Sequence, residues 1–128
     1  MAETLTYSRR VSWASGRAED SASWLAALQG GAGAREDALR ELYALLLRGA
    51  HVELDRRRAS LRHVSGGELD DLAQQAAGDA LVAILAKLDS FRGASRFTTW
   101  AYRFVLLEAG VRARRRACWP ARRLIVFP

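Results

Sequence analysis

The chain has 128 residues, of which 50% are apolar and 27% charged, so it is long enough for one domain with one core and unlike a disordered tail. No apolar run reaches the roughly 18 residues of a membrane-spanning helix, and the first residues lack the hydrophobic centre of a signal peptide. We therefore expect a cytoplasmic protein that makes no contact with a membrane.

The net charge of +6 is concentrated at one end of the chain. Residues 90–128 hold nine arginines and a single acidic residue, Glu108, whereas residues 1–89 hold eleven basic and thirteen acidic residues. This asymmetry predicts that a polyanionic partner binds near the C-terminal end.

Residues suited to catalysis or metal binding are few. One cysteine, Cys118, and two histidines, His51 and His63, offer no spacing for an internal disulfide or a zinc site. The segment GGAGA at 30–34 lacks the lysine and the preceding strand of a phosphate-binding loop. We expect no metal, no cofactor and no catalytic residue, and an enzyme is the least favoured class.

The first half of the chain predicts an arm and two helices. Residues 1–19 are polar and aperiodic, which is typical of a flexible N-terminal arm. A short helix is predicted to open at Asp20 or Ser21 and to stop at Gly30. From 34 to about 62, apolar residues recur three and four positions apart, which predicts a second helix with one buried stripe.

The second half predicts two more helices. The segment SGGE at 65–68 has the pattern of a capping box, in which Ser65 accepts from the Glu68 amide and the Glu68 side chain reaches back. A third helix should follow over about 67–89, and a fourth from near 96 to about 117, because Pro120 cannot continue it. The predicted fold class is all-α: a compact bundle of about four helices over residues 20–117, followed by a tail at 118–128.

The segment SFRGASRFTTWAYRF at 90–104 interleaves arginines with aromatic residues. Single-stranded nucleic acid is held by a cationic path for its phosphates and by aromatic or apolar surfaces for its bases, so this composition favours strand binding. The short loop FRGASRF can line a pocket for an unstacked base. The rings themselves lie at near-helical spacing, which favours a place in the core for Phe91, Phe97, Trp100 and Phe104.

The order of these signals resembles the second domain of bacterial RNA polymerase sigma factors of the extracytoplasmic-function group. The match covers residues 67–116 well and residues 22–60 more loosely. It comprises Asp71, Leu72 and Gln74, then FRG at 91–93, Ser95, Phe97, TW at 99–100, YR at 102–103 and the basic run at 112–116.

The resemblance implies a domain that binds core RNA polymerase and melts the minus-ten promoter element by capturing the non-template DNA strand. The outward face of the third helix would dock on the clamp helices of the largest polymerase subunit, through Asp71, Gln74, Gln75 and Asp79. The loop and the fourth helix would hold the strand, through Arg92, Ser95, Arg96, Thr98, Thr99, Tyr102, Arg103, Leu107, Arg112, Arg114, Arg115 and Arg116. An anti-sigma factor is a further candidate partner.

The sequence departs from the family pattern at several positions. Gln75 stands where the family often has glutamate, Leu107 where it has asparagine near the captured base, and Val111 where it has aspartate. The twelve residues after Arg116 have neither the length nor the pattern of the family's second, helix-turn-helix domain. That leaves a domain fragment, a truncated product or a protein that acts with another subunit.

Two function hypotheses follow. In the first, the domain recognises and melts promoter DNA when bound to polymerase. In the second, it is a protein-interaction module that binds polymerase or an anti-sigma factor without opening DNA, which the absent second domain and Leu107 favour.

Overall fold

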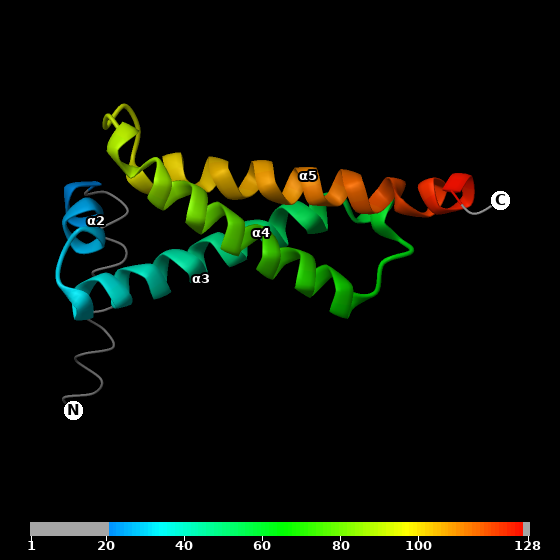
Figure 1. Ribbon diagram of the computed structural model, residues 1–128, viewed down its shortest axis with the longest axis horizontal. Helices are drawn as coiled ribbons and strands as arrows, with labels where there is room; N and C mark the ends of the chain where they lie inside the picture. Colours follow the sequence, from blue (N-terminus) through cyan, green and yellow to red (C-terminus); the bar gives the residue numbers. More distant parts are fainter. Residues whose placement is uncertain (1–20, 127–128) are drawn as a thin grey trace.

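Four α-helices follow one another in the computed structural model, which describes residues 21–126, with side chains described for residues 21–118 (Figure 1). They are α2 (Ser21–Leu28), α3 (Ala32–Arg56), α4 (Gly66–Ala86) and α5 (Phe97–Val126), and short 3-10 turns, η1 (Arg58–Leu61) and η2 (Leu88–Ser90), follow α3 and α4. No strand occurs in this part of the chain, which confirms the predicted all-α bundle. The predicted arm at 1–19 lies outside the described residues.

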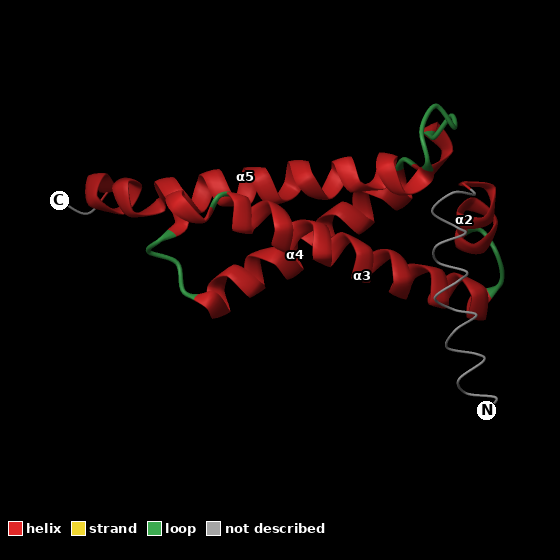
Figure 2. Ribbon diagram, turned by 180° about the vertical axis from the view of Figure 1, so that it is seen from behind, coloured by secondary structure: helices red, strands yellow, loops and turns green. Residues whose placement is uncertain are grey.

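The three long helices pack against one another, and each contacts both of the others. The two connections of α4 lie at opposite ends of the bundle: residues 57–65 near the C-terminal half of α5, and residues 87–96 near its start (Figure 2). The short helix α2 covers the end at which α3 begins and α5 starts (Figure 1).

The core combines large side chains from α3 with small ones from α4 and α5. The buried stripe of α3 includes Leu42, Leu46 and Leu54, whose spacing is the predicted helical period. Alanines line the facing sides of the other two helices and let the helix axes approach closely. The buried alanines are Ala73, Ala76, Ala77 and Ala80 in α4, and Ala101, Ala109 and Ala113 in α5.

The ends of α3 and α4 differ from the predicted ones by a few residues. The helix predicted to reach about 62 ends at Arg56, and the helix predicted to reach 89 ends at Ala86. In each case the following residue, Arg57 or Lys87, has φ near −105° and ψ near 14°, which tightens the chain into a 3-10 turn. The apolar spacing continues through these turns, since Leu61 and Leu88 are buried.

The start of α4 confirms half of the predicted capping box. The hydroxyl of Ser65 accepts a hydrogen bond from the Glu68 amide at 3.1 Å. The other half has support as well: the Glu68 carboxylate accepts from the Nε of Arg116 on α5 at 2.7 Å, and beside this contact a hydrogen bond from the Ser65 backbone amide lowers the pKa of the same carboxyl.

The helix α5 continues past its predicted end near Ala117, through Pro120, to Val126, so part of the predicted tail is helical. Pro120 has no N–H, so the carbonyl of Arg116 lacks its partner four residues on. His63 Nε2 lies 3.2 Å from that carbonyl oxygen. The hydrogen bond lost to proline is thus replaced from outside the helix.

Candidate nucleic-acid interface

The aromatic residues of the 90–104 segment form a ring cluster inside the molecule. Phe97 is fully buried and stacks on Trp24 of α2, with ring centroids 5.5 Å apart. Phe91 meets the edge of Phe97 at 5.6 Å, and Trp100 contacts both of these rings. Phe104 extends the cluster through Trp100 at 4.9 Å. The core interpretation is confirmed for Phe97, while Phe91, Trp100 and Phe104 are partly buried and pack against the core. The four rings hold the two ends of the loop together.

The loop itself, residues 91–96, is shaped by two local features. Gly93 has φ of 78°, a left-handed conformation that favours glycine. The first backbone amide of α5, that of Phe97, donates to the hydroxyl of Ser21 at 2.9 Å. Arg92, just before Gly93, and Arg96, just before Phe97, are exposed. The sequence did not reveal the capping role of Ser21, because the two residues are 76 positions apart.

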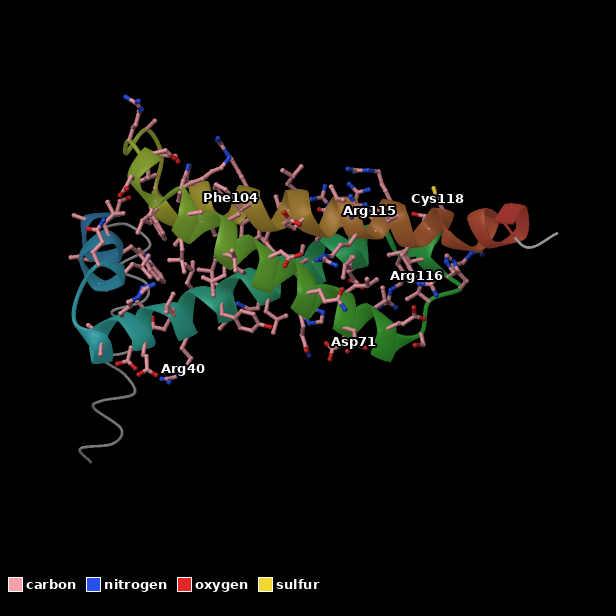
Figure 3. The ribbon with its side chains drawn as sticks, in the orientation of Figure 1. Arg40, Asp71, Phe104, Arg115, Arg116 and Cys118 are labelled. Atoms are coloured by element: carbon pink, nitrogen blue, oxygen red, sulfur yellow. The ribbon has the colours of Figure 1, made fainter. Side chains whose placement is uncertain are left out.

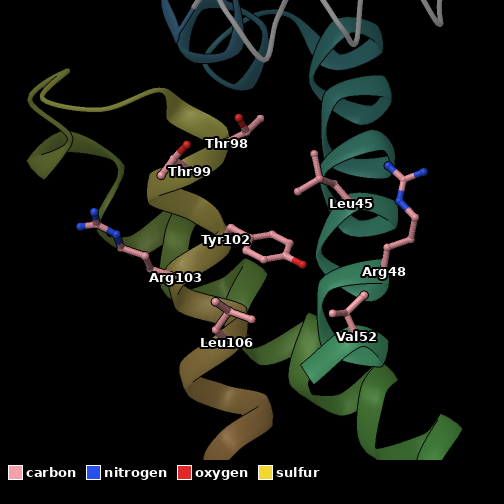
Figure 4. A pocket seen from close by; sticks show the side chains of 8 residues that line it. All are labelled: Leu45, Arg48, Val52, Thr98, Thr99, Tyr102, Arg103 and Leu106. Atoms are coloured by element: carbon pink, nitrogen blue, oxygen red, sulfur yellow. The ribbon is translucent and has the colours of Figure 1, made fainter. Parts of the chain in front are cut away.

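A groove lies between α3 and α5 on the side that α4 does not cover, and we refer to it as the α3–α5 groove. It consists of two adjoining hollows that share Arg103 and Leu106. The upper hollow has a volume of about 490 Å³ (Figure 4). It is lined by Leu45, Arg48 and Val52 from α3 and by Thr98, Thr99, Tyr102, Arg103 and Leu106 from α5.

The floor of the upper hollow is set by Tyr102, whose ring reaches from α5 toward α3 (Figure 4). This close approach requires a glycine on α3: a Cβ at Gly49 would lie 2.5 Å from Cε1 of Tyr102. Val52 beside it is 51% exposed, and Leu107 farther along α5 is 64% exposed. The groove therefore presents apolar surface to solvent between cationic residues.

The lower hollow, with a volume of about 450 Å³, is rich in arginine. It is lined by Glu53, Arg56 and Arg57 from α3 and by Arg103, Leu106, Leu107, Gly110 and Arg114 from α5. Four guanidinium groups thus surround one carboxylate, and the positive potential of the C-terminal half extends onto α3.

Two of the predicted DNA-binding arginines are held by α4. Arg112 donates to Gln75 Oε1 at 2.8 Å and forms an ion pair with Asp79. Arg116 pairs with Glu68 and lies between α5 and the start of α4 (Figure 3). The structure therefore joins residues predicted for two separate surfaces, since Gln75 and Asp79 were assigned to polymerase and Arg112 to DNA.

The contact with Arg116 makes the Glu68 carboxyl more acidic. Its hydrogen bond lowers the pKa of the Glu68 carboxyl, and the charges of Arg116 and His63 act in the same direction. The carboxylate form is thereby favoured. This pair fixes the middle of α5 to the first turn of α4, 48 residues earlier in the chain.

The remaining predicted site residues face solvent in two separate groups. Asp71 and Gln74 lie on the outer face of α4, and Gln74 donates to Asp70 at 3.4 Å (Figure 3). On α5 and its loop, the exposed members are Arg92, Arg96, Thr99, Arg103, Leu107, Arg114 and Arg115, and the half-buried ones are Ser95, Thr98 and Tyr102.

The contribution of α3 to the groove was missed in the sequence. Arg48 and Val52 were not singled out, although they lie four positions apart and share one helix face. An exposed valine beside arginines on an otherwise amphipathic helix is the signal that points to this second face. For Arg56, Arg57 and Arg58 the sequence favoured solvation and left contact with DNA or with an acidic polymerase surface open.

Other kinds of site find little support in the described residues. Within residues 21–118, no group of three or more His, Cys, Asp or Glu side chains could hold a metal ion. Among the helices of the described range, none is long and apolar enough to cross a membrane. Comparison with known proteins gives no match to a family model, to a curated protein or to a solved structure.

Proposed function

We propose that this protein is a sigma-like promoter-melting domain, which binds core RNA polymerase and captures the non-template strand of the minus-ten element. The observation that carries the proposal is the α3–α5 groove, which exposes Val52 and Leu107 between arginines and lies beside the start of α5 and its loop. Its chemistry matches what an unpaired strand requires: apolar surface for bases and guanidinium groups for phosphates.

In the proposed complex, different residues of the groove bind the bases and the phosphates of the strand. Tyr102 and Leu106 offer apolar surface on the floor, while Arg48 and Arg103 line the same hollow. Contacts to phosphates fix the position of a strand and contacts to bases carry sequence information. The ring cluster takes no direct part, since its members pack against one another, and it serves to hold the loop in place.

The polymerase-binding surface of this proposal is the outer face of α4. Asp71 is exposed and forms no ion pair within the described residues, so its charge is open to a partner. Asp79 is already paired with Arg112. A polymerase helix that docks here would meet Asp71 and Gln74 directly and would have to compete for Asp79 with Arg112.

A second candidate function is a protein-interaction module that binds polymerase or an anti-sigma factor without opening DNA. The pairing of Arg112 and Arg116 with α4 favours it, because both arginines are withdrawn from the DNA-binding set.

Two measurements test the proposal. Pull-down with core RNA polymerase should recover the full chain, and Asp71→Ala should reduce recovery. Fluorescence anisotropy with a labelled single-stranded oligonucleotide at several salt concentrations should show binding that weakens steeply with salt.

Charge-matched variants give this binding experiment its control. Arg96→Ala and Arg115→Ala should each weaken strand binding and lower the slope of log K against log salt by about 0.7. Arg40→Ala removes an exposed arginine in the first half of α3, away from the groove, and should leave the slope unchanged (Figure 3). Polymerase binding without any binding of the oligonucleotide would favour the interaction module. Failure to bind polymerase would contradict the promoter-melting function and would leave an anti-sigma factor as the partner of the interaction module.

A further inference from the structure

The lower hollow of the α3–α5 groove carries charges that the protein does not balance. Glu53 accepts from Arg57 Nε at 2.7 Å and lies 3.7 Å from Arg56 Nη1, so one carboxylate serves two guanidinium groups. Arg103 and Arg114 form no ion pair with any described residue. Three positive charges around this hollow are therefore in excess.

The geometry brings two of these guanidinium groups to one point. A Cβ built on Gly110 would lie 3.2 Å from Arg57 Nη2 and 3.4 Å from Arg114 Nη1. Arg57 comes from the end of α3 and Arg114 from α5, so the two helices direct their cations over the same glycine. The two positive charges repel each other, whereas an anion bound between them would be attracted by both.

We propose that the lower hollow is a binding site for a phosphate group, with Arg57 and Arg114 as its principal ligands. The planar guanidinium group presents paired N–H donors that match phosphate oxygens. Gly110 is buried and lets both guanidinium groups approach the backbone of α5, and Leu106 and Leu107 supply an apolar wall for the group that carries the phosphate. Nothing in the sequence resemblance assigns Arg57 or Gly110 a role.

The phosphate can come from a nucleic-acid backbone or from a free phosphate compound. The backbone source depends on the proposed function, because the hollow shares Arg103 and Leu106 with the upper part of the groove, where bases would lie. A free compound would bind by the same contacts without a strand. The test therefore uses one probe for each source.

The first probe is inorganic pyrophosphate, titrated by calorimetry into the full chain. Arg114→Ala and Arg57→Ala should each weaken binding at least tenfold, as expected for lost hydrogen bonds to a charged group. Glu53→Gln should strengthen binding severalfold, because it removes the carboxylate that competes for Arg57. Arg58→Ala, which removes a neighbouring exposed arginine paired with Asp55, should leave affinity unchanged.

Gly110→Ala separates binding from folding. Alanine favours the helix, so the variant should melt no lower than the natural chain. Its Cβ would displace the flexible ends of Arg57 and Arg114, so pyrophosphate affinity should fall. Unchanged pyrophosphate binding in both Arg114→Ala and Gly110→Ala would overturn the site.

The second probe is a 5′-labelled single-stranded oligonucleotide in a salt titration. Arg114→Ala should lower the salt slope by about 0.7 if the occupant is a backbone phosphate. An unchanged slope, with pyrophosphate binding lost, would keep the site and overturn the backbone source. Arg114-dependent pyrophosphate binding by a chain that binds no oligonucleotide and no polymerase would support the site while the proposed function fails.

Discussion

His63 Nε2 lies 3.2 Å from the carbonyl oxygen of Arg116, which Pro120, four residues later, deprives of its helical partner. Since a carbonyl oxygen only accepts, the Nε2 of His63 must carry the hydrogen. The short connection between α3 and α4 thus supports the continuation of α5 through Pro120.

This relationship predicts that His63→Ala frays the last part of α5. Amide exchange in residues 117–126 should become about fivefold faster, which corresponds to one net hydrogen bond of about 1 kcal/mol. Hydrogen exchange followed by NMR measures this directly. In a Pro120→Ala background the Arg116 carbonyl regains a helical N–H, so His63→Ala should then have little effect. An equal effect in both backgrounds would show that His63 acts by another route.

The hydrogen bond between Ser21 and the start of α5 predicts that removal of this helix cap lowers the stability of the fold. The hydroxyl of Ser21 accepts from the first amide of α5, and Ser21→Ala should lower the free energy of unfolding by about 1 kcal/mol. Urea unfolding followed by circular dichroism checks the value. Ser21→Thr keeps the hydroxyl and should retain most of the stability. A loss of the same size in both variants would mean that the cap contributes nothing.

We predict that substitution of Gly49 by alanine destabilises the protein, although the residue lies inside a helix. The new Cβ would meet the ring of Tyr102 at 2.5 Å, and overpacking of this kind costs about 1–3 kcal/mol, more than alanine's helix propensity returns. Gly78 in α4 is the matched control, because no atom lies within 4 Å of its added Cβ. Gly78→Ala should raise the melting temperature while Gly49→Ala lowers it. If the melting temperature rises in both variants, the ring of Tyr102 moves away from the added Cβ without cost, and the prediction is wrong.

The Glu68–Arg116 pair predicts a stability that depends on pH. Because Arg116 lowers the pKa of Glu68 in the folded protein, the pair contributes fully above the carboxyl's unfolded pKa of about 4.3. Its contribution is lost as the pH falls through the lower, folded pKa. Unfolding curves of the natural chain and Glu68→Gln should therefore differ at pH 7 and converge in acid. A constant difference across this range would contradict the assignment.

Local signals in the sequence were sufficient for most of the secondary structure. The three- and four-residue spacing in α3 placed Leu42, Leu46 and Leu54 in the core, and Ser65 marked the start of α4. These features depend on residues within one or two turns of each other. The same holds for the ring cluster, whose helical spacing favoured burial.

Contacts between distant segments could not be predicted in this way. Arg112 and Arg116 belong to one basic run, yet both turn to acceptors on α4, 33 to 48 residues earlier in the chain. Composition shows that arginines are present but not which of them meet an acid after folding. The groove was hidden for the same reason, because six of its fourteen lining residues come from α3 and the others from α5.

Arg112 of α5 pairs with Asp79 of α4, so binding of a ligand to Arg112 and binding of a partner to Asp79 are thermodynamically linked. A ligand that draws its guanidinium away from Asp79 leaves that carboxylate bare for a partner on α4, and a partner that claims Asp79 first releases Arg112. Linkage requires each event to change the affinity of the other by the same factor. One shared side chain is enough to make two binding steps cooperative without any movement of the helices.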